Sequence, residues 1–287
     1  MTRRGLVVLG LGSLMSAMTL VAGRADPIGL ATEWTGHKAG RVRLLASTVP
    51  ASGGARIKPA RLYAGVHVKL ADGWKTYWRQ PGEAGVPPGF DWAGSVNVAE
   101  ARVLFPVPQR LIEAGMTSLG YKHEVVFPVE ITPSDPTKPI ELKLAFEYGI
   151  CKDICIPVEA KLSLAAPVGP VAGEAALVRS YLAKVPSEDA AGQPSVTGFK
   201  ADLAGAAPRF IIDAIFPQGS DGADVLIEVP GGELGPFPVV VERKGRDVVR
   251  FEARFEPATE AKRFAGKALL LTLISAKAQA EARVHVP

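Results

Sequence analysis

Short runs of alternating apolar and polar residues dominate the chain and predict β-strands. Residues 142–148 read Leu-Lys-Leu-Ala-Phe-Glu-Tyr, which would turn the apolar side chains to one face of a sheet. Runs of this kind predict strands at 41–47, 62–70, 125–131, 142–148, 161–165, 210–216, 225–229, 239–241, 248–255 and 268–274. The 24 prolines and 30 glycines are spread throughout and suit a fold with many turns. The pattern therefore predicts an all-β protein built of sandwiches.

One segment departs from the strand pattern. Within 171–185, the residues Ala175, Val178, Leu182 and Val185 recur at helical spacing, and Pro186 follows. Residues 187–194 are small and polar and read as a linker. We therefore expect a β-sandwich domain at 27–168, a helix and linker at 169–195, and a second, smaller β-sandwich domain at 196–287.

The N-terminus has the pattern of an export signal. Arg3 and Arg4 precede an uncharged, mostly apolar stretch at 5–22, and Gly23-Arg24-Ala25 offers small residues for a signal peptidase. We expect a signal peptide at 1–25 cleaved near Ala25, which would make the protein periplasmic; an uncleaved anchor is the alternative. No later segment is apolar enough, for long enough, to cross a membrane, so the mature protein would not itself span one.

Charge and motifs exclude several functions. Residues 1–25 contain three arginines and no acidic residue, so the net charge of +4 falls to +1 without them. The high isoelectric point is therefore no sign of nucleic-acid binding, and no cluster of basic residues with interleaved aromatics occurs elsewhere. No nucleophile elbow, metalloprotease helix motif or Gly-rich phosphate loop is present.

Cys151 and Cys155, the only two cysteines, are the candidate chemical centre. Three residues separate them, unlike the thioredoxin pair, and Ile156 stands where haem attachment needs histidine. In an extended strand they would lie roughly 13 Å apart, whereas a disulfide needs Cα atoms about 4.4–6.8 Å apart. The chain must therefore turn between them, and Gly149 and Pro157 fit a strand, a tight loop and a returning strand.

The residues alone leave the role of this pair open. A structural disulfide across so small a loop would contribute only about 2 kcal/mol, whereas short exposed loops favour a reducible, redox-active bond. Lys152 would lower a neighbouring thiol pKa and Asp153 would raise it. A third alternative is copper or zinc bound by both thiolates with His123 or Met116. No histidines occur at ligand spacing, so we expect neither a metal nor another cofactor.

A second candidate segment, 73–88, contains three aromatic residues followed by a Pro/Gly-rich turn. It could form a recognition surface. For Trp74 and Trp78 we favour core packing instead.

Several motifs together resemble a known family, the N-terminal domain of DsbD-type thiol:disulfide interchange proteins. The three-residue cysteine spacing is closest to the copper-tolerance, ScsB-like branch. The resemblance covers about residues 40–165 and is weaker over 170–287. It is carried by Trp74, Tyr77, Trp78, Arg79, Pro81, Gly82, Gly85, Pro87, Pro88, Asp91, Trp92, Asn97, Phe105, Pro106, Pro108, Gly120, Tyr121, Tyr148, Cys151, Cys155 and Pro157.

The resemblance implies an immunoglobulin-like fold and a redox-active disulfide. The pair would take electrons from a membrane-embedded thiol reductase and reduce oxidised periplasmic proteins, in copper tolerance or cytochrome c maturation. If it is an enzyme, it is a protein-disulfide reductase. The family's transmembrane and thioredoxin-like domains do not appear in this sequence, so we expect a separate membrane partner. The alternatives are an immunoglobulin-like binding module with a structural disulfide and a copper-binding chaperone.

The resemblance also assigns roles within the site. Cys155 would attack the substrate and Cys151 would resolve the mixed disulfide. A cap loop would fall near 117–123, with Tyr121 as the cap residue, and Tyr148 and Lys152 would flank the pair.

Overall fold

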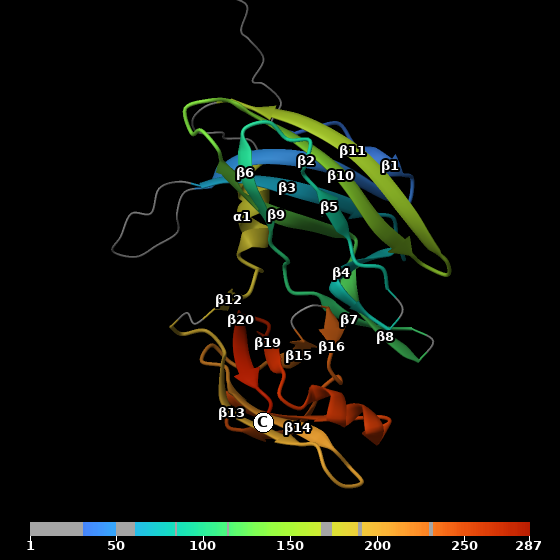
Figure 1. Ribbon diagram of the computed structural model, residues 1–287, viewed down its shortest axis with the longest axis vertical. Helices are drawn as coiled ribbons and strands as arrows, with labels where there is room; N and C mark the ends of the chain where they lie inside the picture. The colour runs from blue at the N-terminus through green and yellow to red at the C-terminus, as the bar shows by residue number, and fades with distance from the viewer. Residues whose placement is uncertain are drawn as a thin grey trace, which may run out of the picture.

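The chain forms two stacked β-sandwiches (Figure 1). The structure is a computed structural model that describes residues 31–49, 61–83, 85–113, 115–167, 174–188, 191–229 and 232–287. The expected all-β class, with an immunoglobulin-like sandwich followed by a helix and a second sandwich, is confirmed. The expected signal peptide lies outside the described residues.

The first sandwich packs a five-stranded sheet against a six-stranded sheet. In spatial order the first sheet contains β1 (Thr35–His37), β2 (Gly40–Val49), β3 (Arg61–Leu70), β9 (Glu124–Pro133) and β6 (Val98–Val103). The second contains β11 (Cys155–Ala166), β10 (Ile140–Cys151), β4 (Lys75–Gly82), β8 (Met116–Lys122) and β7 (Gln109–Glu113), and β5 (Gly89–Asp91) also pairs with β10.

The core of the first sandwich follows from the alternation along its strands. Along β10, Phe146, Tyr148 and Ile150 face the opposing sheet and are buried. Phe90 and Phe127 meet edge to face at 5.5 Å in this core, as aromatic pairs prefer. One continuous apolar layer therefore holds both sheets.

The second sandwich is smaller and has its own core. One sheet contains β12 (Ser187–Glu188), β20 (Gln279–His285), β19 (Ala268–Ile274), β15 (Asp224–Val229) and β16 (Glu233–Leu234). The other contains β13 (Ser195–Asp202), β14 (Arg209–Ile215), β18 (Val248–Arg254) and β17 (Val239–Lys244). A 3₁₀-helix, η1 (Ala258–Phe264), places Phe264 against Phe210 and Phe255 in this core.

The connection between the sandwiches differs in part from expectation. The helix α1 spans Ala175–Leu182, and Val185, expected to continue it, lies beyond it in a turn; residues 171–173 of the expected helix lie outside the described residues. Val178 is fully buried in a small cluster with Leu45. The expected linker at 187–194 begins with β12, because Ser187–Glu188 pairs in parallel with β20. Such pairing satisfies the hydrogen-bonding needs of backbone N–H and C=O groups at a sheet edge. Local composition does not predict it.

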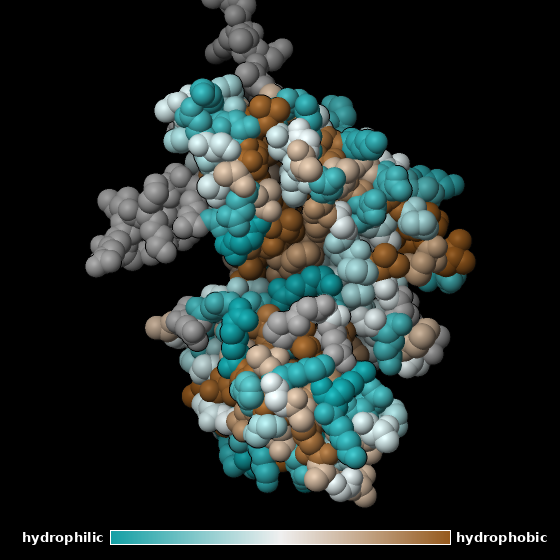
Figure 2. All heavy atoms as spheres, viewed as in Figure 1, coloured by the Kyte–Doolittle hydropathy of each residue, from teal (hydrophilic) through white to brown (hydrophobic). Residues whose placement is uncertain are grey.

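The two sandwiches are joined by partly buried ion pairs. Arg79 on β4 binds Glu228 with two hydrogen bonds, at 3.0 and 2.7 Å, and binds Glu281 at 2.6 Å. Arg110 on β7 binds both carboxylate oxygens of Asp224 at 2.6 Å. Figure 2 shows the sandwiches as an upper and a lower body with an indentation between them. Paired arginine–carboxylate forks of this kind fix geometry as well as adding energy.

Candidate functional site

The β10–β11 hairpin brings the two cysteines together. The strands pair in register from Ile140↔Ala166 to Cys151↔Cys155, and residues 152–154 form the turn. The Cα atoms of the pair lie 4.2 Å apart and the sulfurs form a disulfide. Antiparallel partners lie about 4.5–5.5 Å apart, so continued strand pairing alone carries the chain back to bonding distance. The expected strand, loop and returning strand are present.

The two sulfur-bearing residues differ in exposure. Cys151 is 1 % exposed, whereas Cys155 is exposed. Cys151 is flanked on both sides, because β10 lies between β11 and β4 and Cys151 pairs with Lys75 of β4. Cys155 begins β11, the outermost strand of its sheet. An incoming sulfur can therefore reach Cys155, and Cys151 lies behind it.

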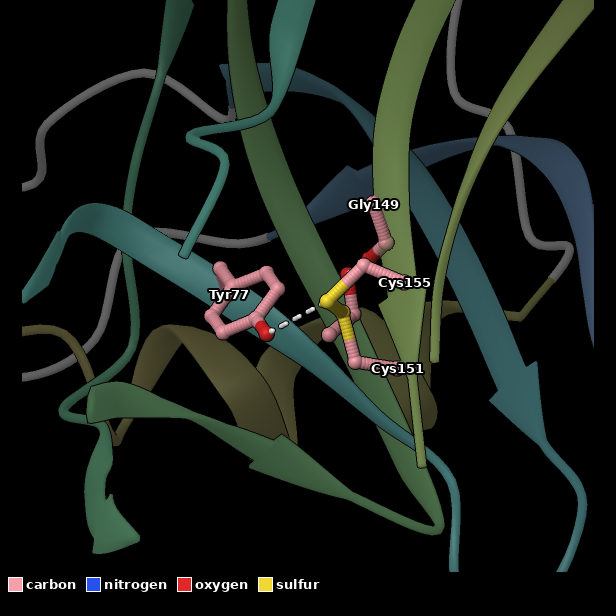
Figure 3. The surroundings of a disulfide bond; sticks show 5 residues. Tyr77, Gly149, Cys151 and Cys155 are labelled. Atoms are coloured by element: carbon pink, nitrogen blue, oxygen red, sulfur yellow. Dashed lines mark hydrogen bonds between the residues drawn. A yellow bond between two sulfur atoms is a disulfide. The ribbon is translucent and has the colours of Figure 1, made fainter. Parts of the chain in front are cut away.

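Tyr77 is the aromatic residue at the disulfide. Its hydroxyl lies 3.6 Å from Cys155 Sγ, and Figure 3 shows it pointing at that sulfur. A disulfide sulfur carries no proton, so the tyrosine hydroxyl is the donor. The ring is buried. A Cβ at Gly149 would lie 3.5 Å from this ring, and one at Gly85 would lie 2.6 Å from it. These two glycines make room for the ring beside the sulfur.

Neighbouring residues fix β4 against the hairpin. The Thr76 hydroxyl donates to the carbonyl oxygen of Gly149 at 2.9 Å. Val86 lies next to the same glycine, 3.3 Å from where its Cβ would be, and remains 53 % exposed. Part of segment 73–88 thus lies beside the disulfide, and the alternation of the sequence did not reveal this.

Tyr121 does not lie where the family resemblance placed it. Residues 116–122 form strand β8 rather than a loop. The Tyr121 side chain is in the core, where its hydroxyl donates to the carbonyl oxygen of Pro106 at 2.7 Å and its ring meets Phe127. Burial raises the pKa of Tyr121 well above its usual value. The expected cap at 117–123 is therefore wrong for Tyr121, and Tyr77 is the tyrosine beside the sulfur.

The other two expected flanking residues, Tyr148 and Lys152, lie in different environments. Tyr148 points into the core, where its hydroxyl donates to Gly40 at 2.7 Å and its ring stacks on Phe146. Burial raises the pKa of Tyr148. Lys152 is exposed in the turn and its side chain lies over Gly73. Only Lys152 of these two lies on the accessible side of the pair.

The aromatic and metal interpretations have different outcomes. Trp78 is fully buried, which confirms the core interpretation for it, whereas Trp74 packs against the same core but stays partly exposed. Met116 is 46 % exposed in β8, and His123 follows that strand with a φ of 66°. Over the described ranges, no group of three or more His, Cys, Asp or Glu side chains could hold a metal ion. In the same part of the chain, no helix is long and apolar enough to span a bilayer.

The matched family is the one that the motifs resemble. Residues 55–167 match the family model described as "Thiol:disulfide interchange protein DsbD, N-terminal". This segment is therefore similar to the DsbD N-terminal family. The matched residues include Tyr77 and both cysteines, so the site described above lies wholly inside the matched segment.

The fold extends this likeness over both sandwiches. The crystal structure of the N-terminal periplasmic domain of ScsB from Proteus mirabilis superposes with a TM-score of 0.66 at 23 % identity. The match covers 90 % of this chain and 98 % of that one. No curated protein sequence matches the chain significantly. The shared architecture is thus a DsbD-type N-terminal sandwich followed by a second β-sandwich.

Proposed function

We propose that the protein is a periplasmic thiol:disulfide exchange protein that works through Cys151 and Cys155. It would take electrons from a membrane-embedded thiol reductase and deliver them to oxidised periplasmic proteins, in copper tolerance or cytochrome c maturation. The DsbD-type family match and the periplasmic location named for the ScsB domain support this assignment. The expected export signal at 1–25 would place the chain in the same compartment.

The unequal exposure of the two cysteines carries the proposal. In the reduced protein, the exposed Cys155 thiolate attacks a substrate disulfide, forming a mixed disulfide and releasing one substrate thiolate. The Cys151 thiolate then attacks Cys155 Sγ, which re-forms the internal disulfide and releases the second substrate thiolate. Two electrons and two protons pass to the substrate. The membrane reductase restores the dithiol by the reverse exchange.

A purely structural disulfide fits the geometry less well. Strands β10 and β11 already pair over twelve positions. In the chain-entropy model, the bond closes so short a loop that it adds only about 2 kcal/mol. An exposed sulfur at the turn end of the hairpin is of little use to a binding module, and it is what exchange with another protein requires.

Trapping with serine variants tests the proposal. Cys151→Ser leaves Cys155 able to attack but removes the resolving thiol, so mixed disulfides with other periplasmic proteins should accumulate in the native host. Cys155→Ser is the matched control and should trap far less, because Cys151 is buried. If neither variant forms a mixed disulfide, or if the midpoint potential lies well below about −300 mV, the exchange function is wrong.

A further inference from the structure

Three turns at one end of the first sandwich enclose a groove beside the disulfide hairpin. The groove has a volume of about 520 Å³. All three residues between the cysteines line it, together with Ile156. Its other walls come from the β1–β2 turn at His37 and Lys38 and from the segment after β3 that includes Trp74. Ile154 projects at its edge and is 68 % exposed, a large apolar side chain left in water.

The groove continues into a basic recess. The recess has a volume of about 430 Å³, shares Lys38 and Ala71 with the groove, and is also lined by Arg41, Lys69 and Glu124. The charged groups of Arg41 and Lys69 lie over the Trp34 ring, at 5.6 and 5.4 Å from its centroid. Both therefore make cation–π contacts with the same ring.

The charge of this surface is unbalanced. Its four cations, Lys38, Arg41, Lys69 and Lys152, are all exposed, and none forms an ion pair with another described residue. The carboxylates that line it are Asp153 and Glu124, and Glu124 is bound to His67. An apolar groove edged by uncompensated positive charge is complementary to an apolar side chain next to carboxylates.

We propose that this surface, the docking groove (His37, Lys38, Arg41, Lys69, Trp74 and Ile154), binds the segment of a partner protein that flanks the partner's reactive cysteine. That segment carries an apolar side chain beside one or more carboxylates. The inference rests on the proposed exchange function. Neither cysteine lines the groove, but the turn 152–154 between them does, so a partner whose sulfur reaches Cys155 would bring the residues that flank its cysteine to the groove. The groove thus selects partners by the chemistry around their cysteines.

Disulfide-linked peptide dimers test this choice of partner. Three dimers are compared, of acetylated Leu-Cys-Glu-Glu, Leu-Cys-Gln-Gln and Leu-Cys-Lys-Lys with amidated ends. Each dimer oxidises the reduced protein and yields two peptide thiols, which chromatography measures. At low ionic strength the Glu dimer should react about tenfold faster than the Gln dimer, and the Lys dimer slowest. In 1 M salt, where the screening length is about 3 Å, the three rates should converge.

Charge-removing variants locate the effect. The variant Lys38→Gln, Arg41→Gln, Lys69→Gln should abolish the preference for the Glu dimer, and it leaves Lys152 beside the thiols unchanged. The control Arg246→Gln, Lys262→Gln, Lys277→Gln removes equal charge from exposed positions of the second sandwich and should keep the preference. Ile154→Ser should slow all three dimers, since the leucine loses its apolar contact.

Contrary outcomes separate the groove from the exchange function. Equal rates for the three dimers, or the same loss in both triple variants, would overturn the docking groove and leave the exchange function standing. If no dimer oxidises the protein, both fail. The proposal would also be wrong if this groove variant reacted with the three dimers as the unchanged protein does. Sedimentation and binding to phosphatidylglycerol vesicles would then show which other contact the variant had lost. The groove would then contact a second copy or a membrane.

Discussion

At the scale of single residues, the Tyr77 hydroxyl determines the environment of Cys155 Sγ. It lies 3.6 Å from the sulfur and can only donate to it in the disulfide state. In the reduced protein the same donor would stabilise a thiolate at Cys155. A hydrogen bond to the charged form lowers a thiol pKa and so raises the fraction of reactive thiolate at neutral pH.

Tyr77→Phe should therefore raise the pKa of the reduced Cys155 thiol. A hydrogen bond to a charged group contributes about 1.5–3 kcal/mol, so the increase should be about one unit or more. The rate of alkylation as a function of pH measures it, in a Cys151→Ser background. Tyr121→Phe is the matched control. Its hydroxyl bonds to Pro106, so this change should leave the thiol pKa unaltered and cost about 1 kcal/mol of stability.

His67 makes the stability of the first sandwich depend on pH. Its side chain is 1 % exposed, Arg43 Nε donates to its Nδ1 at 3.1 Å, and Nε2 bonds to Glu124. Burial lowers the pKa of His67, Arg43 and Lys69 lower it further, and Glu124 opposes them. Because Nδ1 must accept from Arg43, the neutral ring fits this site.

Stability should consequently fall as the solution is acidified below the pKa of about 6.5 that histidine has in the unfolded chain. The unfolded state binds a proton there that the folded state does not, so protonation favours unfolding. Urea midpoints between pH 7.5 and 5 measure this, and His67→Gln should flatten the profile over that range. A profile unchanged by His67→Gln would contradict the assignment.

At the scale of elements, β4 links the disulfide hairpin to the rest of its sheet. It pairs with β10 at Cys151 and with β8 from Lys75 to Tyr77. The pairing with β8 is unusually close, because a Cβ at Gly120 would lie 2.1 Å from the carbonyl oxygen of Thr76. Only glycine fits there, and the position of Tyr77 beside the sulfur depends on it.

Gly120→Ala should force β8 away from β4. We expect a loss of about 2 kcal/mol, typical of overpacking, together with faster alkylation of Cys151 in the reduced protein as its cover loosens. Gly94→Ala is the control, since a Cβ there would meet only Lys143 at 3.5 Å or beyond. Urea unfolding and mass spectrometry of the alkylated thiols measure the two effects. Equal losses in the two variants would contradict this account.

At the scale of the whole molecule, the second sandwich is anchored to the strand that carries Tyr77. Arg79 lies two residues along β4, stacks on Trp78 at 4.3 Å, and binds Glu228 and Glu281 of the second sandwich. Glu228 is 5 % exposed. The second sandwich therefore contacts the same strand, β4, that places Tyr77 beside the sulfur.

Arg79→Gln should destabilise the molecule by about 3 kcal/mol, because it leaves the buried Glu228 carboxylate without its cation. Arg110→Gln breaks the more exposed pair with Asp224 and should cost only about 1 kcal/mol. Urea unfolding followed by tryptophan fluorescence measures both, since all four tryptophans lie in the first sandwich. Adding Glu228→Gln to Arg79→Gln should recover part of the loss. Without such recovery, the pair does not couple the two sandwiches.

Much of the fold could be predicted from the sequence, for local reasons. Alternation at 142–148 identified β10 because one face of that strand is buried and the other is not. The Pro186 stop and the apolar spacing identified α1, but its last residues form a turn. The pairing of Ser187–Glu188 with β20 joins positions almost a hundred residues apart, so no local pattern predicts it.

The sequence by itself determined the hairpin and the identity of its two cysteines, because strand alternation, glycine, proline and spacing act within a few residues. The tertiary structure decided which cysteine is exposed and which tyrosine lies beside it. Tyr77 and Tyr121 sit on the neighbouring strands β4 and β8. Their roles separate only because Tyr77 lies over Gly149 while Tyr121 turns to Pro106 in the core. Side-chain burial and contact depend on packing between distant strands, which one-dimensional patterns do not specify.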